Sequence, residues 1–464
     1  MYYVKSVDWD QLISDYPPPP LYQDTVGKMS ETQIRDLQNR RFLKRVEEAW
    51  QVPFYRSLWQ EAGLQLSDIS CLEDAPRLPM FTTDDLRRAA LDRPPFGSHH
   101  AFGRDDIPGM PLKMHTSGGT TGMPRMTLFD PVALEVQGIQ TARQLYAQGA
   151  RQGDVLQITY TLSLANAGWC GYLAAHHWLG CMPLTTGAGN VTNSERQLEF
   201  AKAVGTNAWF SNPDYLGRLV RVAEDRSFDL HSLPTKFLST FLGHDPDGKM
   251  RRALEEAWNA PLFDNYGSHE VGLVAWECKA GHLHINEDTV HVQICDEAGR
   301  PLEDGQFGTA VVTSLHRTTP HFVRYNIRDR LAIYPHTRCA CGISSRTLSP
   351  MQGRIDQMVK IRGNNVYPTS CKAAINRDPR TNGEYLCVVQ YLGEGIGRSL
   401  EMTVRVERRN TDIDAQALRQ SLEKDLHKDL GLRVEVEIVD PGTLLPFTGE
   451  GEKIKRVLDL RNKH

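Results

Sequence analysis

The chain of 464 residues is longer than one ordinary hydrophobic core supports, so we expect a large domain and a smaller one. Hydrophobic residues make up 40% and charged residues 24%, a globular composition that excludes a disordered or fibrous chain. Because the formal net charge is only −4, neither nucleic acid nor an anionic membrane surface is expected as the main partner.

The N-terminal region predicts one long amphipathic helix. Residues 31–51 place apolar side chains such as Ile34 and Phe42 at near-helical spacing, with charged side chains between them. The middle of the chain then alternates short apolar runs such as residues 154–162 with helical stretches such as residues 214–225. This alternation predicts a mainly parallel sheet that is covered by helices on both faces.

Residues 157–194 contain no Asp, Glu, Lys or Arg. A membrane span requires about 20 mostly apolar residues, but Asn166, His176, His177 and several glycines interrupt this run. We therefore predict a deeply buried helix and strand here. The first residues lack the apolar core of a signal peptide, and the nine cysteines are odd in number and scattered, which favours reduced thiols in the cytoplasm.

The character of the sequence changes near residue 353. Residues 400–407 and 433–440 are predicted strands, and residues 414–430 form a predicted helix that Gly431 ends. We expect an α/β protein with a large N-terminal domain of mixed and parallel sheets covered by helices, and a small mobile α+β C-terminal domain. The predicted domains are residues 1–355 and 356–464, with a hinge near Asp356.

Residues 114–130 are typical of a phosphate-binding loop. Their glycines let backbone N–H groups face an anion, and their hydroxyl groups add further donors. No Lys-Ser or Lys-Thr follows the last glycine, which excludes a Walker loop and with it a P-loop kinase or ATPase. A polar surface hairpin is the alternative. The candidate anion-binding residues are Thr116, Ser117, Gly118, Gly119, Thr120, Thr121 and Gly122.

This loop resembles the nucleotide-phosphate signature of the adenylate-forming enzymes, the superfamily of acyl-CoA synthetases, luciferases and peptide-synthetase adenylation domains. Four later segments resemble further motifs of that superfamily in the same order: residues 265–272, 324–330, 353–368 and 451–459. Patterns such as VPFYRSLWQEAGL and LPMFTTDDLRRA are similar to the phenylacetate-CoA ligase branch. The resemblance thus covers nearly the whole chain.

The resemblance implies an AMP-forming acid–thiol ligase. Such an enzyme uses ATP and Mg²⁺ to activate an organic acid, here expected to be aromatic, as its acyl-AMP, releases pyrophosphate and transfers the acyl group to coenzyme A. An adenylating enzyme that loads a carrier protein or an amine stays open, and so does an adenylate-binding homologue without turnover. The identity of the acid and the oligomeric state, including a homodimer, stay open as well.

The resemblance also assigns roles to single residues at the nucleotide. Tyr266, followed by Gly267, would stack on adenine, and Glu270 would bind Mg²⁺, which prefers hard carboxylate oxygens. Asp329 would accept hydrogen bonds from the ribose hydroxyls, and Arg354 would donate to the same sugar.

Three more residues belong to the predicted mobile domain. Lys453 would bridge the α-phosphate and the substrate carboxylate as a point charge on a long stem, with a solvated lysine in a basic tail as the alternative. Lys360 and Gly363, which follow the hinge at Asp356, would face the nucleotide only in the thioester-forming arrangement. An edge strand with solvated charges is the alternative for that segment.

The chain departs from the family pattern in two places. The phosphate loop has Met123 where a lysine is usual, and Arg125 carries the nearest positive charge, which leaves the ATP affinity open. The residues after Glu270 also differ from those of phenylacetate ligases, so the acid is open too. The acid pocket is expected between the motifs, with Trp169, Tyr172, Phe241 and His269 as candidates.

A second candidate site is a zinc-binding cluster of Cys278, His284, Cys339 and Cys341. Thiolates with one imidazole suit structural zinc, and four protein ligands would leave no position for water or substrate. His282 competes with His284 for the imidazole position. The alternative is four unrelated side chains in two loops.

Overall fold

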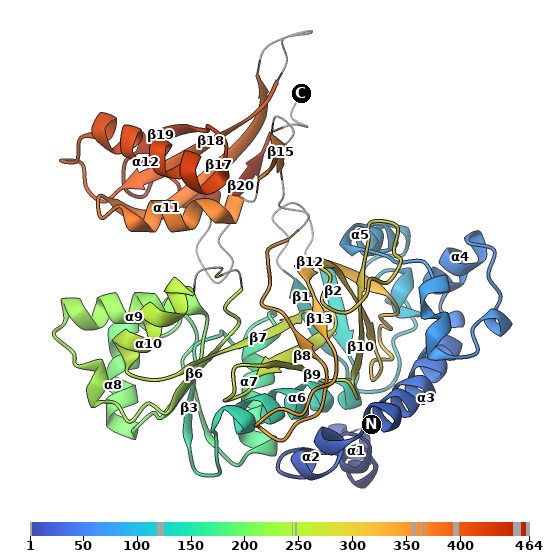
Figure 1. The fold of residues 1–464 in the computed structure, drawn as a ribbon. Coiled ribbons are helices and arrows are strands. Elements are labelled where there is room, and N and C mark those ends of the chain that lie inside the picture. Colours follow the sequence, from blue (N-terminus) through green and yellow to red (C-terminus); the bar gives the residue numbers. More distant parts are fainter. Residues whose placement is uncertain are drawn as a thin grey trace. The chain divides into compact units, whose positions relative to one another are not determined.

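The computed structural model describes residues 2–117, 125–243, 245, 248–354, 359–361, 364–366, 368–392, 399–448 and 456–460. The chain divides into two compact units, Met1–Gln352 and Gly353–His464 (Figure 1). The predicted hinge residue Asp356 lies outside the described residues.

The first unit contains most of the helices. They are α1 (Trp9–Asp15), α2 (Leu21–Asp24), α3 (Glu31–Trp50), α4 (Pro53–Glu61), α5 (Thr83–Asp92), α6 (Pro131–Gln148), α7 (Ala167–Leu173), α8 (Ser194–Val204), α9 (Pro213–Asp225) and α10 (Lys249–Trp258). A π-helical turn, Ala174–Trp178, continues α7, and a 3₁₀ turn spans Ser98–His100.

Helix α3 confirms the long amphipathic helix predicted at the N-terminus. Ser30 and Gln33 form a capping box at its start, where each side chain accepts a hydrogen bond from the other residue's backbone N–H. The predicted apolar face, including Ile34 and Phe42, is buried. Pro53 occupies the first turn of α4, a position in which its missing N–H costs nothing.

The first unit contains three sheets. Their strands are β1 (Lys113–Ser117), β2 (Arg125–Phe129), β3 (Val155–Ile158), β4 (Met182–Thr185), β5 (Ala208–Phe210), β6 (Phe237–Thr240), β7 (Leu262–Ser268), β8 (Gly272–Glu277), β9 (Leu283–Ile285), β10 (Val290–Cys295), β11 (Gly308–Ser314), β12 (Tyr325–Leu331), β13 (Ile333–Tyr334) and β14 (Thr347–Leu348).

The largest sheet has nine described strands in the order β13-β14-β9-β8-β7-β6-β5-β3-β4. The strands from β4 to β7 are parallel, whereas β7, β8, β9, β14 and β13 pair antiparallel. The expectation of a mainly parallel sheet therefore holds for one half only. In the other half, β7, β8 and β9 follow one another through short turns, which join antiparallel strands, whereas parallel strands need long crossovers.

Helices cover both faces of the parallel half, as predicted. On β5, Trp209 points into a cluster with α8, α9 and α10, and the next residue, Phe210, points into a cluster with α6. This alternation follows from the two-residue period of a strand. The predicted deep burial fails at β4, where Met182 is 50% exposed, because β4 is an edge strand of the sheet.

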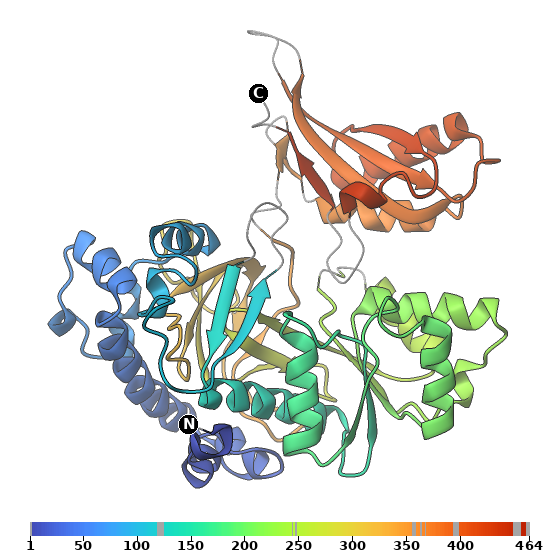
Figure 2. The same ribbon diagram turned by 180° about the vertical axis from the view of Figure 1, so that it is seen from behind.

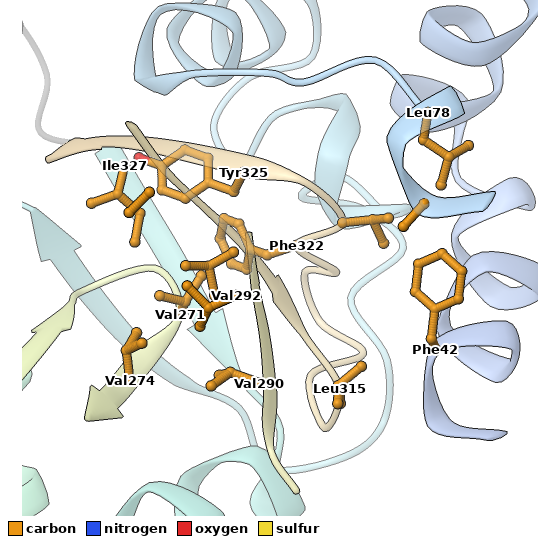
Figure 3. Close-up of a cluster of buried hydrophobic side chains, with 14 of the residues drawn as sticks. Phe42, Leu78, Val271, Val274, Val290, Val292, Leu315, Phe322, Tyr325 and Ile327 are labelled. Carbon is orange, nitrogen blue, oxygen red and sulfur yellow. The ribbon is translucent and has the colours of Figure 1, made fainter. Parts of the chain in front are cut away.

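The three-stranded sheet β10-β11-β12 packs on the N-terminal helices and the antiparallel half of the large sheet. Figure 3 shows this core, in which Val290 and Val292 of β10 and Tyr325 and Ile327 of β12 lie near Val271. The core therefore fixes β12 against the segment that follows β7.

Strands β1 and β2 form a separate antiparallel hairpin, seen as the two cyan arrows in Figure 2. Ser117 pairs with Arg125 at the end of the hairpin where the connecting loop begins, so these two residues flank the predicted phosphate loop. Residues 118–124 themselves lie outside the described residues.

The second unit is an α+β domain, as predicted. Its elements are β15 (Val359–Ile361), β16 (Asn364–Val366), α11 (Cys371–Arg377), β17 (Thr381–Leu392), β18 (Ser399–Arg408), α12 (Ala415–Leu430), β19 (Glu435–Val439), α13 (Leu445–Thr448) and β20 (Val457–Asp459). Leu418, Leu422 and Leu426 of α12 are fully buried against the sheet β19-β18-β17-β20. Gly431 ends α12 with φ +70°, the left-handed conformation that glycine tolerates.

Among the helices that the structure describes, none is both long and apolar enough to span a membrane.

Candidate active site

Tyr266 and Asp329 lie together at the centre of the first unit. The Tyr266 hydroxyl, from β7, donates a hydrogen bond of 2.9 Å to Oδ2 of Asp329, from β12. Both side chains are buried. The structure therefore brings together the two residues that the sequence predicts for adenine and ribose.

Glu270 pairs with Arg125, the residue that follows the undescribed loop. A guanidinium nitrogen of Arg125 contacts Oε1 of Glu270, and each side chain is only 8% exposed. Burial lowers the pKa of the Arg125 guanidinium, although it stays charged in this pair. The predicted Mg²⁺ ligand thus lies next to the stem of the predicted phosphate loop.

Arg317 joins the hairpin to the Glu270 segment. This fully buried residue donates to the backbone carbonyls of Glu270 (2.9 Å), Leu128 of β2 (2.6 Å) and Thr319 (3.1 Å). Its guanidinium also lies over the Phe129 ring, 3.7 Å from the centroid. The sequence analysis missed Arg317, because a single arginine after an apolar strand is indistinguishable in sequence from a solvated one.

The predicted acid-pocket residues fall into two places. Trp169 and Tyr172 of α7 contact each other edge to face, and Tyr172 and Phe241 pack against the same apolar cluster. His269 instead contacts Phe129 of the hairpin, with ring centroids 6.3 Å apart. Three of the four candidates therefore gather near α7, and the fourth lies beside Glu270.

Several predicted site residues fall outside this geometry. The side chains of Ser117 and Lys360 are not described. Eight predicted site residues lie wholly outside the described residues: Gly118, Gly119, Thr120, Thr121, Gly122, Asp356, Gly363 and Lys453. Thr116 is on β1, where its backbone N–H donates to the Leu164 carbonyl. Gly267 follows Tyr266 at an irregularity in the β7–β8 pairing. Arg354 belongs to the second unit, which begins at Gly353.

Comparison with known proteins finds relatives of this chain by sequence. A family of domains described as the AMP-binding enzyme C-terminal domain matches residues 363–461. Phenylacetate-coenzyme A ligase of Thermus thermophilus is 29% identical over 463 residues, which cover 95% of this chain and all of that protein. The protein of the same name from Aromatoleum evansii is also 29% identical, over 96% of this chain and 99% of its own length.

A solved structure agrees over the same extent. A 2-hydroxyisobutyryl-CoA ligase in its postadenylation state matches with a TM-score of 0.79 and 25% identity, over 96% of this chain and 94% of that one. In sequence and fold, the chain is therefore similar to the adenylate-forming enzymes over nearly its whole length. An anthranilate CoA ligase, 15% identical with a TM-score of 0.55, shares the fold.

The protein also has a cluster of thiol and imidazole groups. The ligand atoms of Cys278, His284, Cys339 and Cys341 all lie within 4.8 Å of one another. The Sγ atoms of Cys278 and Cys339 are 3.7 Å apart, and Sγ of Cys341 is 3.3 Å from Nε2 of His284. Tetrahedral zinc with ordinary bond lengths places its ligand atoms roughly 3.3–3.8 Å apart.

The surroundings of this cluster favour His284 over His282 as the imidazole ligand. Nδ1 of His284 is 3.1 Å from Oγ of Ser345, a contact that orients the ring and leaves Nε2 for an ion. His282 contacts Cys339, through Nδ1 at 3.4 Å, and the edge of the His284 ring, and it is exposed. The hydrogen bond between Cys341 and Cys278 lowers the pKa of the Cys278 thiol and raises that of Cys341, so Cys278 is the thiolate of this pair, the form that binds metals.

Proposed function

We propose that this enzyme activates an organic acid with ATP as its acyl-AMP, releases pyrophosphate, and then transfers the acyl group to coenzyme A. Two contacts carry the proposal: Tyr266 with Asp329, and Glu270 with Arg125, which pairs with Ser117 at the stem of the phosphate loop. Relatives that align over nearly the full chain bear the name of an acid–coenzyme A ligase, which supports the same activity.

Each residue of this group contributes by positioning or by charge. Tyr266 and Asp329 hold the adenosine, because a buried phenol offers a flat face and a carboxylate accepts hydrogen bonds from vicinal hydroxyls. The Glu270 carboxylate is a hard oxygen ligand and fits Mg²⁺, which would neutralise charge on the phosphates. Arg125 adds a cation beside them, and Lys453 brings the attacking carboxylate to the α-phosphate.

For the acid we propose an aromatic carboxylate. Trp169, Tyr172 and Phe241 supply aromatic surface near α7, and curated relatives are named for phenylacetate. A flat aromatic acid buries well against such rings. The anthranilate CoA ligase of the same fold acts on an aromatic acid, whereas the 2-hydroxyisobutyryl-CoA ligase acts on a small aliphatic one.

The test is acid-dependent exchange of labelled pyrophosphate into ATP, measured over a panel of aromatic and aliphatic acids. We expect exchange with at least one aromatic acid, and a coenzyme A thioester of that acid when the thiol is added. No exchange with any acid would contradict the proposal. Exchange followed by transfer only to a phosphopantetheine carrier protein would instead identify a carrier-loading enzyme.

Lys453→Ala checks the role of the mobile lysine in the same assay. We expect exchange to fall by about 100-fold or more, because the lysine supplies charge in the first half-reaction. Thioester formation from supplied acyl-AMP should persist. Unchanged exchange would show that Lys453 is a solvated tail residue.

We further propose that Cys278, His284, Cys339 and Cys341 hold a structural zinc ion. Soft thiolates with one imidazole are a typical zinc donor set, and the separations of the ligand atoms suit tetrahedral coordination. Four protein ligands leave no open position, so the ion would stabilise the fold rather than take part in the reaction.

A further inference from the structure

The contact between Arg125 and Glu270 presents a conflict with the role proposed for Glu270. A guanidinium in contact with Oε1 of Glu270 opposes a divalent cation at the same carboxylate, because two positive charges held a few ångströms apart repel each other. Both side chains are 92% buried, so neither is neutralised by solvent. The carboxylate proposed to bind the metal is thus paired with an internal cation.

The surroundings of Arg125 favour an exchange of partners. Its Nε atom is buried and has no hydrogen-bond acceptor among the described residues, so the guanidinium is incompletely satisfied in this pair. Arg125 is also paired with Ser117 at the stem of the hairpin, directly beside the phosphate loop. A guanidinium released from Glu270 there is adjacent in sequence to the residues proposed to bind the phosphates.

The backbone at this place does not depend on the ion pair. Arg317 binds the carbonyl of Leu128 on β2 and the carbonyl of Glu270 at the same time, and therefore fixes the spacing between the hairpin and the Glu270 segment. Breaking the contact between Arg125 and Glu270 leaves this bridge intact. The exchange can thus occur without opening the core.

We propose that Arg125 occupies the cation position of Glu270 while no nucleotide is bound, and that arrival of the metal–nucleotide complex transfers Glu270 to the metal and Arg125 to the phosphate chain. This inference rests on the proposed function. Arg125 then has two roles. Before the nucleotide binds, it opposes a free divalent cation at Glu270. Afterwards, it supplies the positive charge that Met123 does not supply where a lysine is usual. Metal and nucleotide therefore enter together.

The experiment measures Mn²⁺ binding to the nucleotide-free full-length protein from the electron paramagnetic resonance signal of the free ion. We expect Arg125→Gln to tighten Mn²⁺ binding by roughly tenfold or more, because the competing cation is gone and Glu270 is left as a buried, unpaired charge. Glu270→Gln in the same background should abolish the gain. The matched control is Arg87→Gln. Arg87 is an exposed arginine whose charge also acts on Arg125, but its ion-pair partner is Asp84 and not Glu270.

A second readout follows ATP binding in EDTA by calorimetry. We expect Arg125→Gln to weaken metal-free ATP binding by roughly tenfold, and Arg125→Lys to restore most of it, since a phosphate contact of an arginine is charge-assisted. Equal Mn²⁺ affinity in wild type and Arg125→Gln, or a gain that also appears in Arg87→Gln, would overturn the inference. Acid-dependent exchange by the wild type is measured separately, so the proposed function can stand if the inference falls.

Discussion

The imidazole of His100 is held in its neutral form by two opposite hydrogen bonds. Its Nε2 accepts from the backbone N–H of Leu128 at 3.3 Å, so Nδ1 must carry the proton that it donates to the Phe96 carbonyl at 2.6 Å. Protonation would place a second donor against the Leu128 N–H. Burial, and then the positive charge of Arg317, lower the pKa of His100 to about 3 from its ordinary 6.5.

This shift predicts a stability loss in acid. Between pH 6.5 and about 3 the unfolded chain binds a proton that folded His100 does not, so the free energy of unfolding falls as the pH decreases through this window and is constant above it. Within this window, one such group lowers the free energy of unfolding by about 1.4 kcal/mol for each pH unit of acidification. We expect His100→Gln to be less stable at pH 7.5 but to show a shallower pH dependence, as measured by urea denaturation between pH 7.5 and 4.5.

The exposed His231 provides the control for this measurement. His231→Gln should retain the wild-type slope. An unchanged slope in His100→Gln would mean that His100 does not stay neutral in the folded protein.

At the scale of the elements, the turn between β7 and β8 positions two proposed nucleotide residues, Tyr266 and Glu270. Gly267 lies between them at an irregularity of the pairing. A Cβ atom at Gly267 would contact the Gly272 carbonyl oxygen and would lie 3.1 Å from Cα of Leu273. Both neighbours are backbone atoms, which cannot move away as a flexible side chain would.

Gly267→Ala should therefore act on both stability and nucleotide binding. We expect a loss of about 1–3 kcal/mol in the free energy of unfolding, because the strands must separate, and a higher KM for ATP. The control is Gly217→Ala inside α9, where no atom lies within 4 Å of the added Cβ and helix propensity should increase stability by up to about 1 kcal/mol. Wild-type denaturation midpoints for both variants would contradict this account of the turn.

The elements also show how much of the fold and the site could be predicted from the sequence. Helices α3, α9 and α12 lie within a residue of their predicted ends, because their apolar stripes, caps and the stop at Gly431 are local signals. The motifs located Tyr266, Glu270 and Asp329, but the bridge made by Arg317 joins segments far apart in sequence. The exposure of Met182 depends on the edge position of β4, and no local pattern encodes strand order.

At the scale of the whole molecule, the two units have separate hydrophobic cores. The cluster around Phe42 and Val290 belongs to the first unit, and the cluster around Leu418 and Val404 belongs to the second. A perturbation of one core should therefore affect mainly its own unfolding transition. The proposed zinc ligands all lie in the first unit.

Metal analysis of the purified protein should find about one zinc ion per chain. Removal of the ion with a chelator, or Cys339→Ser, should lower the calorimetric Tm of the first unit and leave the transition of the second unchanged. Cys71→Ser is the matched control, because Cys71 lies outside the cluster and its thiol donates to Asp74, which accepts equally from a hydroxyl. Absence of zinc together with an unchanged Tm under chelator would remove the metal site.

The separation of these ligands along the chain has a consequence for biosynthesis. Cys278 and His284 leave the ribosome first, and the two later thiols follow only after β10, β11 and β12 have been made. An ion bound by the first pair would have an incomplete set of ligands until the two later thiols are available. Full coordination would need Cys341, which lies close to Gln352, the last residue of the first unit. Metal capture would thus mark the moment at which the nascent first unit is complete.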